Sequence, residues 1–305
     1  MILDAHAHLY HPSWYPAAFS RSIANDYVRR LRDLGRPVPT NNAEALVSRM
    51  LTDGTGEAAL TIMDKVGINK RFILILDWGV ELGEAEKSIW EIHRDILGIC
   101  TRFRDRLVGF AGVDPRRSDA MALLNWAFDD LGARGLKLHP TSRWRLDDPA
   151  THRVVRAAAN RRLPVLVHIG KTVDCLSDAN AQPQALIALA KAFQDVTFIA
   201  GHSGFEAWIT FASSPEVPRN LYFDISGWQE LHSRNAAGMK AALSGLLKAF
   251  PGRVCFGSDS PFFSYNLVTS EAWWLKTIVD CEREELGETS PSTLLCNPVF
   301  KELLT

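Results

Sequence analysis

The sequence predicts an α/β fold, a distorted (β/α)8 TIM barrel, and three observations support this prediction. Eight short apolar runs rich in β-forming residues recur along the 305 residues, and helical patterns separate them. This alternation is typical of parallel strands joined by crossover helices. The competing doubly wound sheet requires a glycine-rich phosphate-binding turn, and neither GxGxxG nor GxxxxGK[ST] occurs. We therefore expect one barrel domain over residues 1–305.

The predicted strands and helices alternate in chain order. The strands are expected at Ile2–His8, Phe72–Asp77, Leu107–Asp114, Gly135–His139, Pro164–His168, Thr197–His202, Leu221–Ser226 and Val254–Asp259. Helices are expected at Gly56–Val66, Ala85–Phe103, Asp119–Leu131, Ala150–Arg161, Pro183–Phe193 and Met239–Phe250, with C-terminal helices at Ser270–Leu286 and Pro291–Leu304.

An insertion, Leu9–Thr55, interrupts this rhythm directly after the first predicted strand. Its richness in Pro, Trp, Tyr and Arg predicts a loop or a small subdomain. Barrel active sites lie at the carboxyl ends of the strands, so a lid or a substrate-selecting role is one interpretation. A packed decoration without such a role is the other.

Composition restricts the partners of the protein. A net charge of −1 gives no electrostatic reason to expect nucleic acid, so a small molecule is the expected partner. The five cysteines are widely spaced without a CxxC pair, which predicts neither a disulfide framework nor a Cys-ligated zinc. No apolar run approaches the roughly 18 to 20 residues of a membrane span. We expect a cytoplasmic protein, for which a homodimer through outer helices would be unsurprising.

Two histidines at the end of the first predicted strand are the first candidate metal ligands. Side chains alternate between the faces of a strand, so His6 and His8 should project from one side together with Asp4. Two imidazoles then converge on one point, as metal binding requires. The pair alone fits hydrogen-bonded structural histidines equally well, and Asp4 is expected to be buried and hydrogen-bonded.

Four later strands also end on groups that bind metals or transfer protons. These groups are His139, His168, His202 and Asp259. Five of the nine histidines thus fall at the carboxyl ends of predicted strands, where a barrel gathers its catalytic groups. A shared active site explains this placement better than separate structural roles do.

On these residues the sequence resembles the amidohydrolase superfamily, and within it the amidohydrolase-2 branch of hydrolases and decarboxylases related to aminocarboxymuconate semialdehyde decarboxylase. The motifs that match, over nearly the whole chain, are His6-x-His8, Gly135-Leu-Lys-Leu-His-Pro140, His168, Gly-His-Ser-Gly around His202 and Gly-Ser-Asp-Ser-Pro around Asp259.

The resemblance implies one divalent ion, commonly zinc, held by His6, His8, His168 and Asp259, with His202 as a catalytic histidine. Such ligands also suit Mn, Fe, Co or Ni. Three imidazoles and one carboxylate leave a position for water, whose pKa the ion lowers towards about 7. Asp259 is suited to move the water proton, and His202 to polarise a substrate carbonyl.

The predicted function is metal-dependent hydrolysis of a small carboxylic-acid derivative, an amide, lactone or ester. The nearest alternative is non-oxidative decarboxylation of an aromatic or unsaturated acid in the same site. A metal-free lactonase and a non-catalytic ligand-binding protein with a vestigial site are further alternatives, but the complete ligand set argues against both.

The fourth predicted strand and the loop after it supply candidate substrate-binding residues. Lys137 and His139 share a strand face and should reach the barrel mouth. A carboxylated Lys137 bridging a second metal, with His202 as a ligand, is the alternative. Arg143 and Arg145 should lie above the metal and predict an acidic substrate, unless this loop is only a solvated loop anchored by Trp144.

Four further polar residues stand at strand ends, namely Asp77, Asp114, Asp224 and Ser226. They are expected either to support the site through hydrogen bonds or to cap the following helices.

Overall fold

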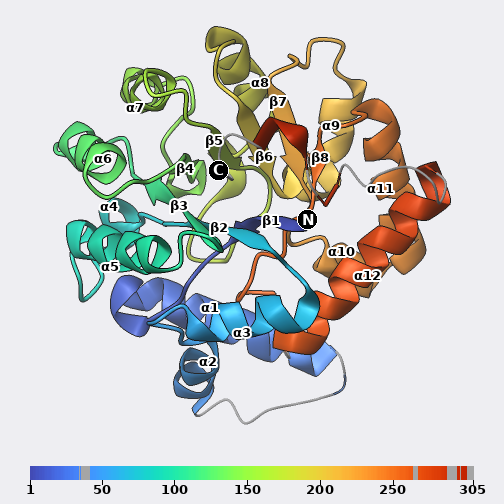
Figure 1. Ribbon diagram of the computed structural model, residues 1–305, viewed down its shortest axis with the longest axis horizontal. Coiled ribbons are helices and arrows are strands. Elements are labelled where there is room, and N and C mark those ends of the chain that lie inside the picture. The colour runs from blue at the N-terminus through green and yellow to red at the C-terminus, as the bar shows by residue number, and fades with distance from the viewer. Residues whose placement is uncertain (34, 36–41, 264–266, 287–293, 296, 301–305) are drawn as a thin grey trace.

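The computed structural model describes residues 1–33, 35, 42–263, 267–286, 294–295 and 297–300. Eight parallel strands form one sheet in chain order, and the helices lie around it (Figure 1). The strands are β1 Leu3–Ala7, β2 Lys70–Leu74, β3 Leu107–Gly112, β4 Leu136–Leu138, β5 Val165–His168, β6 Phe198–Gly201, β7 Leu221–Asp224 and β8 Val254–Cys255. Backbone hydrogen bonds from Asp259 N to His6 O (2.8 Å) and from His8 N to Ser260 O (2.7 Å) close the sheet. The predicted TIM barrel is confirmed.

The helices of the described residues surround this barrel. They are α1 Ala17–Asp33, α2 Ala43–Leu51, α3 Glu57–Val66, α4 Gly79–Leu82, α5 Ile89–Arg102, α6 Ala120–Asp129, α7 Pro149–Ala159, α8 Pro183–Ala192, α9 Trp208–Ser213, α10 Gln229–Arg234, α11 Ala236–Ala249 and α12 Leu267–Leu286. None of these helices has the length and the apolar run needed to cross a bilayer.

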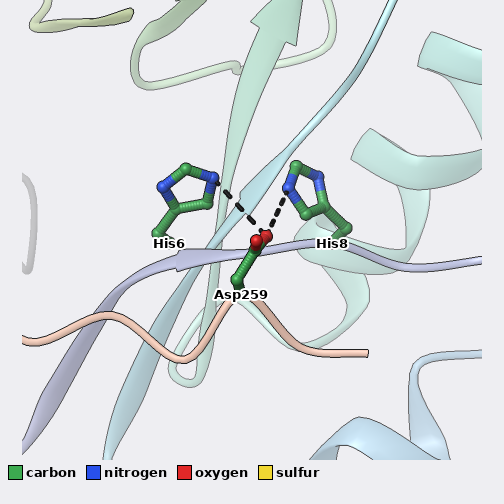
Figure 2. Close-up of side chains that lie close together, drawn as sticks. All are labelled: His6, His8 and Asp259. Atoms are coloured by element: carbon green, nitrogen blue, oxygen red, sulfur yellow. Dashed lines mark ion pairs between the residues drawn. The ribbon is translucent and has the colours of Figure 1, made fainter. Parts of the chain in front are cut away.

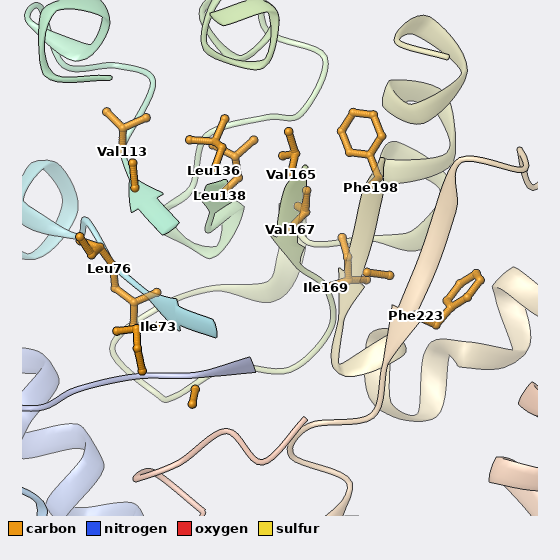
Figure 3. Close-up of a cluster of buried hydrophobic side chains, with 14 of the residues drawn as sticks. Ile73, Leu76, Val113, Leu136, Leu138, Val165, Val167, Ile169, Phe198 and Phe223 are labelled. Atoms are coloured by element: carbon orange, nitrogen blue, oxygen red, sulfur yellow. The ribbon is translucent and has the colours of Figure 1, made fainter. Parts of the chain in front are cut away.

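The main hydrophobic core lies between the strands and the surrounding helices. Figure 3 shows side chains such as Leu136, Leu138, Val165 and Val167 pointing outward from the strands. Because successive side chains alternate across a strand, Lys137 between two of them points into the barrel. The same alternation directs some polar side chains of the strands, such as that of Lys137, into the barrel interior.

A separate apolar cluster fills the amino-terminal half of the barrel. Phe300 is only 1% exposed and packs with inward-facing side chains that include Leu3, Phe72 and Phe110. Nearby, Leu3 N donates to Leu295 O at 2.7 Å. In place of the predicted helix Pro291–Leu304, Pro298–Phe300 forms a single 3-10 turn, while 291–293, 296 and 301–304 lie outside the described residues.

A β-bulge in β1 changes which face of the strand the following side chains point to. Asp4 pairs with Arg71 and Ala7 with Ile73, so β1 has one residue more than β2 over this stretch. The carboxylate of Asp4 contacts Arg71 Nε at 2.8 Å, and Arg71 contacts Glu271 on the outer helix α12. The prediction that Asp4 shares a face with the two histidines is therefore wrong. Asp4 is nevertheless buried and accepts from Ser258 N at 2.9 Å, as predicted.

Helix α5 begins at Ile89, four residues after the predicted start, because Ser88 caps it. Glu91 N donates to Ser88 Oγ at 3.3 Å, and Ser88 N donates to Glu91 Oε2 at 2.9 Å. This capping box satisfies two backbone donors that the helix itself leaves unpaired.

Replacing Ser88 by alanine removes the hydroxyl oxygen that accepts from Glu91 N, and it should lower the free energy of unfolding by about 1 kcal/mol. Urea denaturation followed by circular dichroism measures the change. Ser118→Ala, at an exposed turn position, serves as the control and should change stability by less than about 0.5 kcal/mol. Equal stability of the two variants would show that the cap contributes nothing.

Candidate active site

A cavity of about 570 Å³ lies at the carboxyl ends of the strands. Seven residues predicted from the sequence line it, namely His6, His8, Lys137, His139, His168, His202 and Asp259. All of them lie in or shortly after the carboxyl-terminal part of a strand, so the barrel brings them together from five different strands. The structure therefore places these predicted residues around one cavity, although His168 is not in either described group whose donor atoms lie within 4.8 Å of one another.

Three of these residues place possible ligand atoms within 4.8 Å of one another: His6, His8 and Asp259. His8 Nε2 lies 3.3 Å from Asp259 Oδ1, and His6 Nε2 lies 3.8 Å from the same oxygen. Figure 2 shows the two rings on either side of the carboxylate. All three side chains are buried, so water competes little for their donor atoms.

Backbone carbonyls fix which ring nitrogen of three histidines carries the proton. His8 Nδ1 lies 2.8 Å from Leu74 O, and His168 Nε2 lies 2.8 Å from Lys171 O. His202 Nδ1 lies 2.9 Å from Ser226 O. A carbonyl oxygen only accepts, so each of these nitrogens donates and the other nitrogen of each neutral ring carries a lone pair.

These lone pairs face acceptors rather than donors. His202 Nε2 and His168 Nδ1 are 3.1 Å apart, and His8 Nε2 faces the carboxylate of Asp259. Buried acceptors that face one another are unfavourable unless a proton or a cation lies among them. The donor set of imidazole nitrogens and one carboxylate therefore fits a divalent ion.

Burial shifts the protonation of these groups in the direction that metal binding requires. It lowers the pKa of His6, His139 and His168 well below the ordinary value, so their rings are neutral. Burial also lowers the pKa of Lys137 to about 8. Although burial opposes it, the pKa of Asp259 is lowered because imidazoles surround the carboxylate. Neutral rings and an ionised carboxylate are the forms that bind metals.

His202 and Asp259 share an uncommon backbone conformation. Their φ angles are 60° and 52°, in the left-handed region that non-glycine residues seldom adopt. Hydrogen bonds hold both residues there, from His202 N to Asp224 Oδ1 at 3.1 Å and from Asp259 N to His6 O at 2.8 Å. Such conformations cluster at active sites, where the surrounding structure maintains them.

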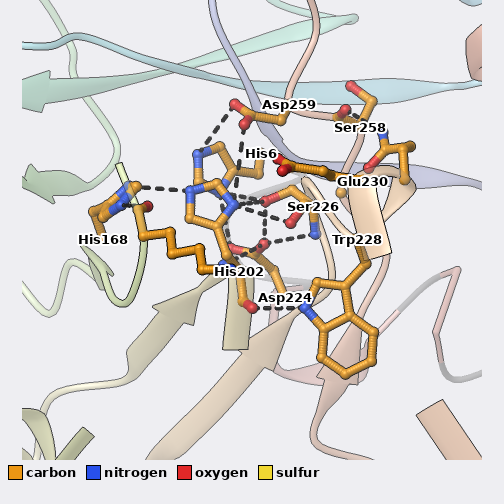
Figure 4. Close-up of polar contacts among 12 residues, drawn as sticks. His6, His168, His202, Asp224, Ser226, Trp228, Glu230, Ser258 and Asp259 are labelled. Carbon is orange, nitrogen blue, oxygen red and sulfur yellow. Dashed lines mark hydrogen bonds and ion pairs between the residues drawn. The ribbon is translucent and has the colours of Figure 1, made fainter. Parts of the chain in front are cut away.

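Polar contacts connect the histidines beneath the cavity (Figure 4). His6 Nδ1 lies 2.9 Å from Asp224 Oδ2, and Ser226 Oγ lies 3.0 Å from the same nitrogen. His6, His202 and Asp224 also form a second group with donor atoms within 4.8 Å of one another. Because His6 Nδ1 is already bonded to Asp224, we assign this group to hydrogen bonding.

Asp77 and Asp114 do not line the cavity. Asp77 accepts from Arg117 Nε at 2.6 Å, and Asp114 accepts from Arg116 Nη2 at 2.7 Å. Asp77 Oδ2 also accepts from the backbone N–H of Asp114 at 2.8 Å. These two carboxylates thus hold the loops after β2 and β3.

The insertion after β1 forms one wall of the cavity. Its helix α1 places Phe19, Ile23, Asp26 and Arg30 along the cavity. These residues are not among those predicted from the sequence, although the apolar spacing of Phe19, Ile23 and Tyr27 is typical of a helix with one buried face. The described residues of the insertion are largely helical, as in a small subdomain.

Arg143 and Arg145 do not reach the cavity. Arg143 pairs with Glu81 at 2.6 Å, and Arg145 pairs with Asp147 at 2.6 Å. The side chains are 57% and 64% exposed, respectively, whereas Trp144 between them is buried. The structure thus places this loop as a solvated loop anchored by its tryptophan, which was the alternative interpretation.

Other basic side chains stand at the rim of the cavity. Arg30 lies 3.5 Å from Glu230, and Lys171 lies 2.8 Å from Glu206. Arg234 contacts Glu230 as well. These ion pairs connect α1 with α10, and the segment after β5 with the segment after β6.

Comparisons with known proteins agree with this architecture. A probable 2-pyrone-4,6-dicarboxylic acid hydrolase from Acinetobacter baumannii, with citric acid bound, has a TM-score of 0.63 at 15% identity, covering 99% of this chain and 98% of that chain. A 5-carboxyvanillate decarboxylase from Sphingomonas paucimobilis has a TM-score of 0.60 at 18% identity, covering 94% and 96%. A mutant 5-carboxyvanillate decarboxylase from Novosphingobium aromaticivorans, with bound manganese and a nitrobenzoic acid, has a TM-score of 0.62 at 15% identity, covering 100% and 97%. At these identities the likeness shows the fold.

Sequence comparison places the chain in a family. No curated protein sequence matches it. The family model described as amidohydrolase, however, matches residues 3–288, which include every candidate ligand. The resemblance seen in the strand-end motifs is thereby confirmed, and the chain belongs to the amidohydrolase family.

Proposed function

We propose that the protein is a divalent-metal-dependent hydrolase of a small carboxylic-acid derivative. The observation that carries this proposal is the set of lone pairs on His8, His168 and His202 that face acceptors inside one cavity. His6, His8, His168 and Asp259 would hold the ion. Zinc is the metal we propose, although manganese occurs in a protein of similar fold.

A divalent ion held there would supply a Lewis acid and lower the pKa of water. Asp259 is the base we propose, because its carboxylate is ionised and buried beside His6 and His8. It accepts the proton of the attacking water and returns it to the leaving group. The backbone bond from Asp259 N to His6 O keeps this carboxylate at a fixed place in the cavity.

His202 is the second catalytic group that we propose. Its Nδ1 donates a hydrogen bond to Ser226 O. Its Nε2 therefore carries the lone pair and lies next to His168 in the cavity. When it takes up a proton, Nε2 donates a hydrogen bond to the substrate oxygen on which negative charge develops. Burial lowers the pKa of His202 below its ordinary value, and the nearby carboxylates of Asp259 and Asp224 oppose this shift.

Lys137 and His139 are the proposed substrate-binding residues, and the substrate is proposed to be acidic. Lys137 Nζ lies on the cavity floor, 3.4 Å from His6 Nε2, where its ammonium can bind a carboxylate. His139 stacks on His168 with ring centroids 4.1 Å apart. Trp78 and Phe262 add apolar surface to the cavity wall.

Arg143 and Arg145 are left out of the proposed binding site, because both lie away from the cavity in exposed ion pairs. We also propose one ion rather than two. A second ion would require carboxylation of Lys137, whereas the proposed binding of an acidic substrate uses its ammonium group.

Decarboxylation of an aromatic acid is the second candidate reaction. The aromatic wall of the cavity favours it, since Phe19, Trp78 and Phe262 present flat surfaces. Two of the similar solved structures are also decarboxylases. In this reaction the same acid–base groups would deliver a proton to the carbon that loses carbon dioxide.

Metal analysis combined with a product assay tests the proposal. Protein purified without chelator should contain about one equivalent of a divalent transition metal, and removing the metal should abolish turnover until it is restored. With candidate amides, lactones and aromatic acids, hydrolysis produces a new carboxyl group, whereas decarboxylation releases carbon dioxide. Substantially less than one equivalent, with no gain on reconstitution, would contradict the metal site.

A further inference from the structure

One carboxylate beneath the cavity, that of Asp224, is linked by hydrogen bonds to two histidines, His6 and His202. Asp224 Oδ2 lies 2.9 Å from His6 Nδ1. Asp224 Oδ1 accepts the hydroxyl of Ser226, and Ser226 Oγ lies 3.0 Å from His6 Nδ1 and 2.9 Å from His202 Nδ1. Figure 4 shows this hydroxyl between the rings and the carboxylate. All four side chains are buried.

We propose that Asp224 is a positioning residue that fixes the Nδ1 proton of His6 directly and that of His202 through the hydroxyl of Ser226. The meaning of this role for catalysis rests on the function proposed above, in which His6 binds the metal and His202 assists the substrate. The role itself concerns only where two protons reside.

Backbone donors fix the hydrogen-bonding role of Asp224. Asp224 Oδ1 accepts two backbone N–H groups, from His202 at 3.1 Å and from Ser226 at 3.0 Å. Because this oxygen is an acceptor, the hydroxyl of Ser226 donates its only proton to it. The oxygen of Ser226 is then left with lone pairs and accepts from the imidazoles beside it.

With Asp224 ionised, both of its oxygens are acceptors, and both rings therefore carry a proton on Nδ1. For His6 the acceptors are Asp224 Oδ2 and Ser226 Oγ, and for His202 they are Ser226 O and Ser226 Oγ. Each neutral ring has one N–H, so Nε2 of each carries the lone pair. His6 Nε2 is the nitrogen nearer Asp259, and His202 Nε2 is the nitrogen next to His168.

The chain leaves space for this arrangement at Gly257. A Cβ atom at this position would lie 2.9 Å from Ser226 Cβ and 3.0 Å from His6 Cβ. Any larger residue at position 257 would force Ser226 or His6 to shift. The absence of a side chain on the neighbouring segment thus permits the close contact between β1 and β7.

Replacing Asp224 by asparagine tests the proposal with little change in shape. The amide oxygen should take the Oδ1 position, where two backbone N–H groups need an acceptor, and the NH2 group then faces His6 Nδ1. His6 must move its proton to Nε2 and lose its metal-binding lone pair. We expect Mn²⁺ affinity, measured by competition with a chelator, to fall about 10- to 100-fold.

Imidazole ¹⁵N NMR of the full chain supplies a second measurement that does not depend on turnover. In the wild type His6 and His202 should both show the Nδ1–H form. In Asp224→Asn only His6 should switch, because the Ser226 hydroxyl still donates to the amide oxygen. In Asp224→Ala this hydroxyl is no longer oriented, and both rings should change; if that variant does not fold, Asp224→Asn still decides.

Asp114→Asn is the matched control, since Asp114 is also 0% exposed at a strand end but contacts Arg116 rather than a histidine. It should keep both the Mn²⁺ affinity and the tautomers. Wild-type affinity together with an unchanged Nδ1–H on His6 in Asp224→Asn would overturn the positioning role. A wild type that binds no Mn²⁺ or Zn²⁺ would instead contradict the proposed function, and the NMR comparison would still test Asp224.

Discussion

Replacing Asp259 by asparagine is expected to lower kcat by about 1,000- to 10,000-fold, the upper range for removing a general acid–base group. The amide cannot accept the proton of the attacking water, and it also removes a negative charge from between His6 and His8. Metal content should fall as well. The measurement is kcat at saturating metal, with the substrate that the product assay identifies, together with elemental analysis of the variant.

Asp147→Asn is the control for this substitution. Asp147 is 63% exposed and pairs with Arg145 on the surface, away from the cavity. Its kcat and metal content should equal those of the wild type. If Asp259→Asn retained kcat within about tenfold, another group would have to move the proton and the assigned role of Asp259 would be wrong.

Replacing His202 by glutamine should lower kcat by about 100- to 1,000-fold, the loss typical of one donor to a developing oxyanion. Metal content should stay unchanged, because His202 is outside the proposed ligand set. Elemental analysis of the purified variant and steady-state kinetics measure the two effects separately.

His93→Gln removes an equally buried histidine and serves as the comparison. His93 lies on α5 and contacts Ile89 O at 2.8 Å, outside the cavity. It should retain metal and most of its kcat. Loss of metal in His202→Gln would make His202 a ligand and favour the two-metal site, whereas an unchanged kcat would remove it from the mechanism.

The sequence was sufficient to predict the barrel and the meeting of its strand-end histidines. Parallel strands carry continuous apolar runs, and a closed barrel brings all their carboxyl ends together. His168 and Asp259 could therefore be assigned to one site although they are distant in sequence. That part of the prediction depends on topology alone.

The orientation of individual side chains depends on contacts that the spacing of apolar residues does not predict. Asp4 was placed on the wrong face because one extra residue in β1 resets the alternation after it. Arg143 was assigned to the substrate because its loop lies near the barrel mouth, whereas its guanidinium binds Glu81, 62 residues earlier in the chain. The insertion after β1 is predicted as a loop or a small subdomain near the active-site face, but its composition does not reveal which side chains of α1, such as Phe19 and Ile23, line the cavity.

The packing of Phe300 inside the amino-terminal half of the barrel determines how molecules pass through the site. Apolar side chains fill the barrel on that side, and the cavity lies at the carboxyl ends of the strands. A reacted molecule therefore leaves by the route through which the next one arrives. Because entry and exit share this opening, a slowly departing product competes directly with fresh substrate for the cavity.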